Sequence, residues 1–377
     1  MSQWLWPCVV LVAAFGAGCE TLQKTDEPEA GAPAKEAAAE PDALIAPTAL
    51  REIGYSLEWL SDLALADQER VEHATAMDGT LITIELPGNM VSAISLRDGS
   101  PMWRRLLGSP NDVLYKPTWG NEHVVINSGS TVYQLQPANG KLESLSRPAS
   151  PVANSPAVKN RYAFYGTISG KVIAHDLRAG YAKAEYDMGE RILARPVFVR
   201  NDMFVVNASG QFARLATTGP LLGLVWANKV WERVSNTPVV SRLGIFFTSD
   251  DRTLYAIDPD TGSEMWKQRL EEPFRGGAWV DETLVITQSA DDVTRTFDAA
   301  DNGRMMWTLS PSATPLARVD DHLVMYRDDE ILIVQPQTGK VLDQAKTKPL
   351  AHLLHVGEGV LIAITREGRV ARLDPTE

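Results

Sequence analysis

The stretch Thr237–Trp266, TPVVSRLGIFFTSDDRTLYAIDPDTGSEMW, decides the fold of this chain. Three short runs rich in β-branched and aromatic residues are separated by Pro, Asp and Gly clusters, a pattern typical of successive antiparallel strands. The run that ends at Trp266 is the fourth strand. Four strands within about 40 residues make a sheet that cannot bury both of its faces alone. The stretch therefore predicts neighbouring sheets of the same kind.

The turn glycine of this stretch recurs along the chain at intervals of 36 to 43 residues. A tryptophan follows the glycine by four residues in three units, and an alanine precedes it by six residues in four units. A fixed period near 40 residues with strand-like composition predicts radial or solenoidal repetition. The recurring residues are Gly99, Gly140, Gly180, Gly219, Gly262, Gly303 and Gly339; Trp103, Trp266 and Trp307; and Ala93, Ala174, Ala213 and Ala256.

Counting one central strand per unit gives eight units within residues 49–377, with seven as the alternative. The last unit reaches Thr376 without a fourth strand. The run Tyr55–Leu60 supplies a candidate and places Trp59 in the tryptophan register, so we predict a ring closed by the first ordered strand, which would protect strand edges. An amphipathic helix is the alternative for this run, because its leucines keep helical spacing.

The sequence therefore predicts an all-β, eight-bladed propeller of four-stranded antiparallel blades. The glycine would supply a positive φ in a tight turn, the tryptophan would bury its ring between adjacent blades, and the alanine would let neighbouring sheets approach. These tryptophans are therefore interpreted as core residues rather than a ligand platform. The predicted structural residues are Trp59, Trp103, Trp266, Trp307, Gly99, Gly262 and Gly303.

Residues 1–18 have the features of a bacterial lipoprotein signal peptide. The apolar run Trp4–Ala17 is too short to span a bilayer comfortably and ends in small residues before Cys19, the predicted lipidation site. Two features depart from the usual lipobox: Gly16 stands where leucine is preferred, and the first three residues carry no Lys or Arg. A short uncleaved anchor or another cleavage site is the alternative. Removal of the signal would also remove Cys8, which leaves one thiol and no possible disulfide.

Residues 19–48 are predicted to be a lipidated cysteine followed by a disordered tether, because this segment is rich in Ala, Pro and Glu and has no aromatic residue. Lipidation would anchor the chain to a membrane. In a bacterium with two membranes, Glu20 favours the outer one. The net charge of −12 argues against a nucleic-acid partner, since phosphate binding needs clustered basic surface.

The unit Leu254–Trp266 resembles the pyrroloquinoline-quinone-type propeller repeat. A single propeller behind an export signal, a lipobox and a tether resembles the BamB-type outer-membrane assembly lipoproteins. This resemblance implies a non-catalytic scaffold without a cofactor, a monomer within a larger complex. It would be anchored at the periplasmic face of the outer membrane and bind envelope proteins, among them the barrel-assembly machinery.

The alternative class is a periplasmic ligand-binding or quinone-dependent enzyme propeller that uses the central channel. Quinoprotein dehydrogenases share the repeat but are longer, and many carry a vicinal disulfide, whereas residues 49–377 contain no cysteine. His352 and His355 have a spacing that sends them to opposite faces of a strand. We predict no catalytic, cofactor-binding or metal-binding residues.

One segment is unusually apolar for the outer strand of a blade, Leu221–Trp226 with Val230 and Trp231. If it is exposed, it is a hypothetical partner-binding surface. The alternative is a displaced fourth strand in which Trp226 or Trp231 takes the tryptophan position.

Overall fold

The computed structural model describes residues 44–218 and 222–376. The predicted signal peptide, Cys19 and most of the predicted tether lie outside these residues, as does the turn glycine Gly219. The predictions for these segments therefore stay predictions.

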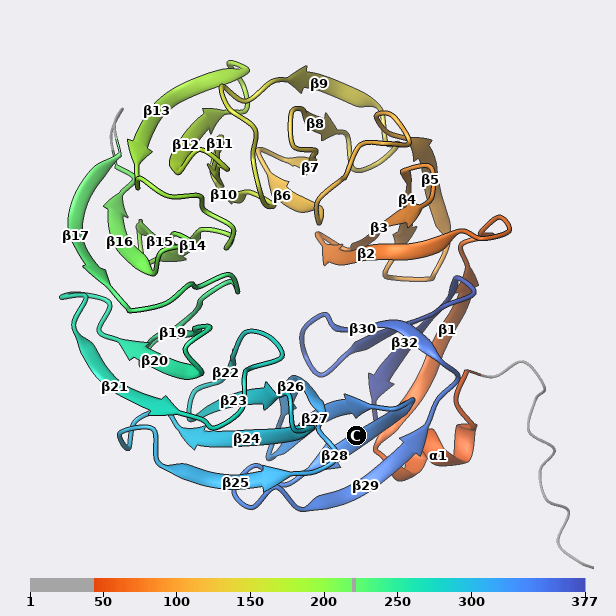
Figure 1. The fold of residues 1–377 in the computed structure, drawn as a ribbon. Helices are drawn as coiled ribbons and strands as arrows, with labels where there is room; N and C mark the ends of the chain where they lie inside the picture. The colour runs from red at the N-terminus through yellow and green to blue at the C-terminus, as the bar shows by residue number, and fades with distance from the viewer. Residues whose placement is uncertain (1–43, 219–221, 377) are drawn as a thin grey trace, which may run out of the picture. The chain divides into compact units, whose positions relative to one another are not determined.

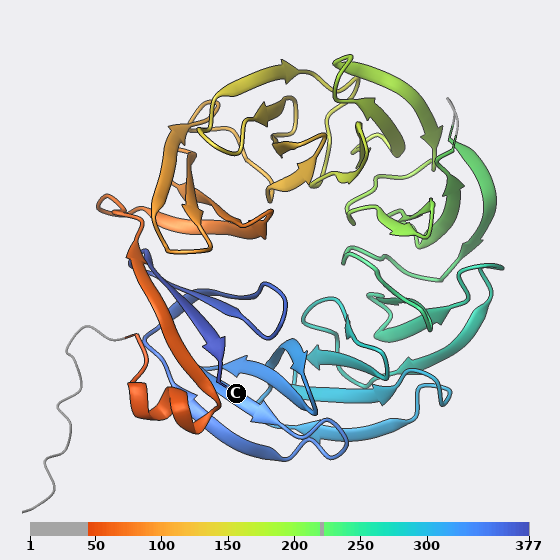
Figure 2. The same cartoon turned by 180° about the vertical axis from the view of Figure 1, so that it is seen from behind.

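Eight antiparallel sheets of four strands each stand in a ring in the described part of the chain, as Figures 1 and 2 show. This arrangement confirms the eight-bladed propeller and excludes seven blades. Blades 1 to 4 are β2 (Arg70–Met77), β3 (Thr80–Leu86), β4 (Met90–Ser95), β5 (Pro101–Leu106); β6 (Thr118–Gly120), β7 (His123–Asn127), β8 (Val132–Leu135), β9 (Leu142–Ser146); β10 (Ala157–Lys159), β11 (Tyr162–Gly166), β12 (Lys171–Asp176), β13 (Tyr181–Asp187); and β14 (Val197–Val199), β15 (Asp202–Val206), β16 (Gln211–Ala216), β17 (Gly223–Lys229).

Blades 5 to 8 continue the ring in the same order, from the innermost to the outermost strand. They are β18 (Val239–Ser241), β19 (Gly244–Thr248), β20 (Thr253–Ile257), β21 (Glu264–Arg269); β22 (Trp279–Val280), β23 (Leu284–Ser289), β24 (Val293–Asp298), β25 (Met305–Leu309); β26 (Thr314–Val319), β27 (His322–Arg327), β28 (Glu330–Val334), β29 (Val341–Lys346); and β30 (Leu350–His355), β31 (Leu361–Thr365), β32 (Arg369–Pro375) with β1 (Tyr55–Asp62).

The ring is closed by β1, which is the outermost strand of blade 8. It pairs antiparallel with β32 from Tyr55 opposite Pro375 to Asp62 opposite Arg369. Trp59 lies opposite Arg372 in this ladder. The closure by the first ordered strand is confirmed, and the helical alternative for Tyr55–Leu60 is excluded.

The chain before β1 is packed against blade 7. Leu44 and Ile45 are each 4 % exposed, and Ile45 forms a β-bridge with Thr347 at the end of β29. Helix α1 (Pro47–Glu52) begins with a proline at its first turn, where a missing N–H costs nothing, and buries Leu50. The packed body therefore includes the last residues of the segment that we assigned to the tether.

Every outermost strand contains a β-bulge at the same place, immediately before the residue in the tryptophan position. In blade 1, for example, Ala93 pairs with Trp103 and Ile94 with Pro101, so that Met102 is the extra residue. A bulge bends its strand and increases the local twist. The bulge residues are Glu58, Met102, Glu143, Lys183, Val225, Met265, Met306 and Leu342.

Antiparallel order gives the ring two faces with different connections. One face carries the glycine turns between the third and fourth strands and the hairpins between the first and second; we call it the turn face. The opposite face carries the hairpins between the second and third strands and the connections from each outermost strand to the next innermost strand; we call it the loop face. Backbone hydrogen bonds join neighbouring connections there, as from Asp250 N–H to the carbonyl of Arg233.

Candidate functional site

The recurring Gly and Trp of the repeat meet at the joints between blades. The ring of Trp59 in blade 8 lies against Gly99 of blade 1 so closely that a Cβ on Gly99 would be 2.6 Å from its Cε3. The indole N–H of Trp59 donates to the carbonyl of Leu96 in the same turn at 3.1 Å. The tryptophan thus clamps the turn of the following blade, and only glycine leaves room for it. The pairs are Trp59–Gly99, Trp103–Gly140, Trp226–Gly262, Trp266–Gly303 and Trp307–Gly339.

The partner of each glycine is therefore the tryptophan of the preceding blade. Gly262 contacts Trp226, whereas Trp266 reaches forward to Gly303. Trp266 and Trp307 are 6 % and 7 % exposed. The structure places all five tryptophans in the joints; Trp59, Trp103 and Trp226 are only partly buried there. The alanine faces the tryptophan across the ladder, as Ala256 faces Trp266, rather than lying on the innermost strand where blades converge.

The joint between blades 2 and 3 lacks a tryptophan, because Ser144 takes that position opposite Gln134. Here the side-chain amide of Gln134 donates to the carbonyl of Leu177 at 2.6 Å, the place that an indole N–H takes at other joints. Ser146 Oγ lies 2.8 Å from Nε2 of His175, which is fully buried. Burial lowers the pKa of His175. A polar contact replaces the aromatic clamp at this joint.

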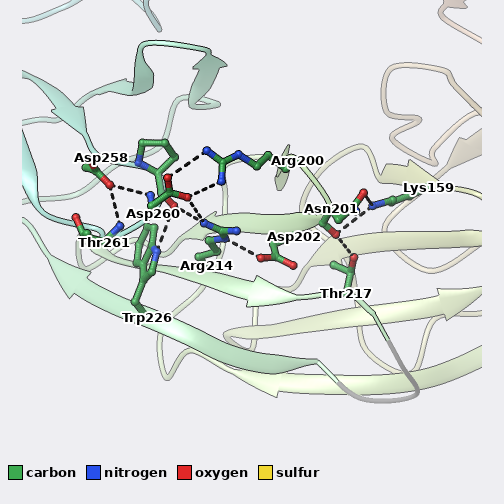
Figure 3. A network of polar contacts seen from close by, with 11 residues as sticks. Lys159, Arg200, Asn201, Asp202, Arg214, Thr217, Trp226, Asp258, Asp260 and Thr261 are labelled. Carbon is green, nitrogen blue, oxygen red and sulfur yellow. Dashed lines mark hydrogen bonds and ion pairs between the residues drawn. The ribbon is translucent and has the colours of Figure 1, made fainter.

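The joint between blades 4 and 5 is reinforced by ion pairs (Figure 3). Arg214 lies opposite Trp226, donates to the carbonyl of Pro259 at 2.7 Å, and pairs with Asp202 at 2.7 Å. Asp260 of blade 5 accepts from Arg214 and, through both oxygens, from Arg200 at 2.8 and 3.1 Å. Arg214 and Asp202 are only 12 % and 16 % exposed, so this pair is shielded from solvent, whereas Arg200 and Asp260 are 66 % and 54 % exposed. The contacts of Arg214 with Pro259 and Asp260 connect the two blades.

Arg372 takes the position of Arg214 at the joint between blades 8 and 1. It donates to the carbonyl of Leu96 at 2.8 Å, beside the indole of Trp59, and pairs with Asp374 at 2.7 Å. Sequence reasoning missed both arginines. Arg214 directly follows the recurring Ala213 and stands five residues before Gly219, and only the ladders show that Arg214 and Arg372 lie opposite Trp226 and Trp59.

The apolar segment near blade 4 divides into two parts. Trp226 occupies the tryptophan position and donates to the carbonyl of Pro259 at 3.3 Å, so the displaced fourth strand is the correct interpretation for it. Leu224 and Val225 at the start of β17 are 51 % and 48 % exposed. Trp231 follows the other end of this strand and is 91 % exposed. Two exposed features about 20 Å apart along a strand replace the single patch that we hypothesised.

The exposed large apolar side chains of the described residues fall into two groups. Most of them lie on the outermost strands. The three most exposed do not: Val113 at 69 %, Ile168 at 60 % and Trp231 at 91 %. All three belong to connections on the loop face, after blade 1, within blade 3 and after blade 4. The loop face over blades 1 to 4 is therefore the candidate partner-binding surface.

The described residues contain no group of three or more His, Cys, Asp or Glu side chains placed to hold a metal ion. They also contain no helix that is both long and apolar enough to cross a membrane. His352 and His355 lie on β30, and Nε2–H of His352 donates to the Val71 carbonyl of blade 1 at 3.1 Å.

The chain matches the family model for the outer membrane protein assembly factor BamB over residues 56–222 and 222–374. Among solved structures, BamB from Moraxella catarrhalis is similar with a TM-score of 0.65 at 19 % identity, over 84 % of this chain and 98 % of that one. The computationally designed Ika8 protein has a TM-score of 0.66 at 13 % identity, over 83 % and 98 % of the two chains. At these identities, the structural matches show the fold alone. A search of curated proteins found no match.

The repeat, the closed ring of eight blades and the family model, which covers nearly all of the described propeller, agree with one another. The resemblance to pyrroloquinoline-quinone-type repeats is confirmed, and this chain belongs to the BamB family of outer membrane protein assembly factors.

Proposed function

We propose that this protein is a non-catalytic scaffold that is lipidated at Cys19, tethered to the periplasmic face of the outer membrane, and bound to the barrel-assembly machinery through its loop face. Membership of the BamB family supports the role in assembly. The exposure of Trp231 supports the choice of surface.

Trp231 is the observation that carries the proposal. A side chain of this size leaves most of its apolar area in water, although Val230 and Val234 beside it are buried at 6 % and 0 %. The buried valines and the ion pair between Arg233 and Asp250 fix the loop before and after Trp231. An exposed tryptophan on a fixed loop is typical of an interface anchor, since aromatic residues dominate binding free energy.

The joints explain why this propeller suits a scaffold. Tryptophan–glycine contacts at five joints, and hydrogen bonds such as that from Arg214 to the carbonyl of Pro259, hold neighbouring blades together. The loops on the loop face are therefore presented from a rigid ring, and little conformational entropy is lost when a partner binds.

The experiment is co-purification of barrel-assembly subunits from solubilised membranes. We expect Trp231→Ala to reduce recovery about tenfold or more, since truncating an anchor removes about 2 kcal/mol or more. Val225→Glu, which changes the exposed outermost strand and not the loop face, is the matched control and should leave recovery unchanged. Normal recovery with a folded Trp231→Ala protein would exclude this surface. Reduced recovery of barrel-assembly subunits with Val225→Glu alone would instead place the interface on the outermost strands.

A further inference from the structure

The innermost strands carry basic residues at one level around the central axis. We define this level from the pairing between strands. In each blade, cross-strand pairs connect the tryptophan position to one residue of the innermost strand, for example Thr75 in blade 1, Thr118 in blade 2 and Val197 in blade 4. The residue two positions earlier lies one step further along the channel, within the strand in blades 1, 7 and 8 and just before it in blades 2 to 6; in blade 7 a bulge separates Pro315 from Ala317. From blade 1 to blade 8, these residues are His73, Lys116, Ser155, Arg195, Thr237, Gly277, Pro315 and His352.

Four of these eight positions are basic or titrate to a cation, and none is acidic, in a chain whose net charge is −12. A balanced surface would place acidic side chains among them. Two carboxylates lie nearby. Glu72 is the bulge residue of β2 and pairs with Arg70 at 3.4 Å, while Asp78 lies in the exposed hairpin at the turn-face end. Glu72 acts electrostatically on His73, but neither carboxylate pairs with Lys116 or Arg195.

Lys116 and Arg195 flank blade 3, where the corresponding residue is the small Ser155. Arg195 is held in place because its Nε donates to the carbonyl of Pro156 at 3.0 Å, which leaves the end of the guanidinium without a partner among the described residues. Lys116 has no hydrogen bond or ion pair within the same part of the chain. It borders a cavity of about 380 Å³ that is also lined by Thr75, Leu354 and His355.

These cations influence one another. Burial, and then the charge of Arg195, lowers the pKa of Lys116, and burial lowers the pKa of Arg195. Burial lowers the pKa of His73, the charge of Glu72 opposes this shift, and His352 and Lys116 make smaller contributions that lower it further. The charges of Lys116, which is exposed, and Arg195, which is half-buried, therefore act on each other, and an anion between them would relieve their repulsion.

We propose that the central channel is an anion-binding site in which Lys116 and Arg195 together hold a dianion of the phosphate type. The free edge of a guanidinium can donate two parallel hydrogen bonds to two phosphate oxygens, and the lysine adds a second positive charge. A dianion balances both positive charges, whereas a monoanion balances only one. This site is separate from the loop-face surface proposed above, and neither proposal depends on the other.

Titration calorimetry of the purified protein at low ionic strength tests the site, with inorganic phosphate and glycerol 3-phosphate as probes. We expect saturable binding of one anion per chain. Lys116→Gln and Arg195→Gln should each weaken it about tenfold or more, because a charge-assisted contact is lost. Lys229→Gln removes the same charge from the exposed outermost strand and should leave affinity unchanged.

The two probes distinguish the sources of such a group. Equal affinity for both identifies a free phosphate, and tighter binding of glycerol 3-phosphate identifies a phosphate ester such as a lipid headgroup; both results support the site. Absence of binding for both probes at millimolar concentration, or an equal loss with Lys229→Gln, would overturn it.

Thermal unfolding separates a binding role from a structural one. Without an anion, the Lys116→Gln/Arg195→Gln protein should melt at the same temperature as the wild type or higher, since two repelling charges are removed. Phosphate should raise the melting temperature of the wild type and not that of the double variant. A double variant that melts well below the wild type in the absence of anions would show that these cations stabilise the ring through protein contacts, against the proposal.

Discussion

Gly303 and Trp266 form the joint between blades 5 and 6, and their contact can be measured as a coupling free energy. Gly303 has φ +65°, and a Cβ placed there would lie 2.5 Å from Cε3 of Trp266. Gly303→Ala therefore meets two separate penalties. A left-handed backbone costs an L-residue about 1–2 kcal/mol, and the forced displacement of the tryptophan ring adds about 1–3 kcal/mol.

Trp266→Ala removes the ring itself. The side chain is 6 % exposed, and its N–H donates to the carbonyl of Ala299 at 3.1 Å. We expect this change to lower the free energy of unfolding by about 3–5 kcal/mol, the usual effect of truncating a buried aromatic residue. In the double variant the clash is gone, so Gly303→Ala should cost only the backbone penalty of about 1–2 kcal/mol.

Gly79→Ala is the matched control. Gly79 has φ +71°, close to that of Gly303, but a Cβ there would meet no atom within 4 Å. Gly79→Ala therefore measures the backbone penalty alone, without a steric clash. Urea unfolding followed by far-UV circular dichroism gives each value, and comparison of midpoints is valid where the slope is unchanged. If Gly303→Ala and Gly79→Ala destabilise equally, or if the double variant is additive within about 0.5 kcal/mol, the glycine and the tryptophan are not coupled and our account of the joints is wrong.

Three further predictions concern the termini and a buried histidine. Cys19→Ser should abolish incorporation of labelled palmitate and release the protein from membranes in a fractionation experiment; unchanged labelling would refute lipidation there. Deletion of β1 leaves β32 without its partner, so we expect self-association through the free edge in light scattering, whereas a monodisperse monomer would contradict this role of β1. Burial lowers the pKa of His175, so below about pH 6.5 the unfolded chain binds more protons than the folded chain. The free energy of unfolding should therefore keep the full contribution of His175 above that pH and decrease as the pH falls below it. His175→Gln should flatten this fall in urea titrations, and an unchanged slope would show that His175 is not the group responsible.

The repeat made most of the ring predictable, because its landmarks are separated by constant distances along the chain. The count of one central strand per unit predicted eight units, and the structure has eight blades. Trp226 could not be placed with the same certainty, since its distance from Gly219 is seven residues rather than four. Only the ladder, with Trp226 opposite Arg214, shows that it occupies the same position as Trp266.

Features that depend on register between strands could not be obtained from the sequence. The bulge before each tryptophan position has no residue preference, since Glu58, Lys183 and Met265 all occupy it. The level shared by Lys116 and Arg195 is hidden for a similar reason. The innermost strands are short, two to three residues in β6, β14 and β22, and too short for a periodic pattern.

The joints are not equally reinforced, and their differences bear on where a partner binds. The tryptophan position is held by Ser144 in blade 2, Ala184 in blade 3 and Asp343 in blade 7, so three of the eight joints lack the tryptophan–glycine contact. Blades 2 to 4 therefore form the arc in which two neighbouring joints lack the tryptophan, while Arg214 connects the next joint through the carbonyl of Pro259. Ile168 and Trp231 project from blade 3 and from the connection that follows blade 4, next to this arc.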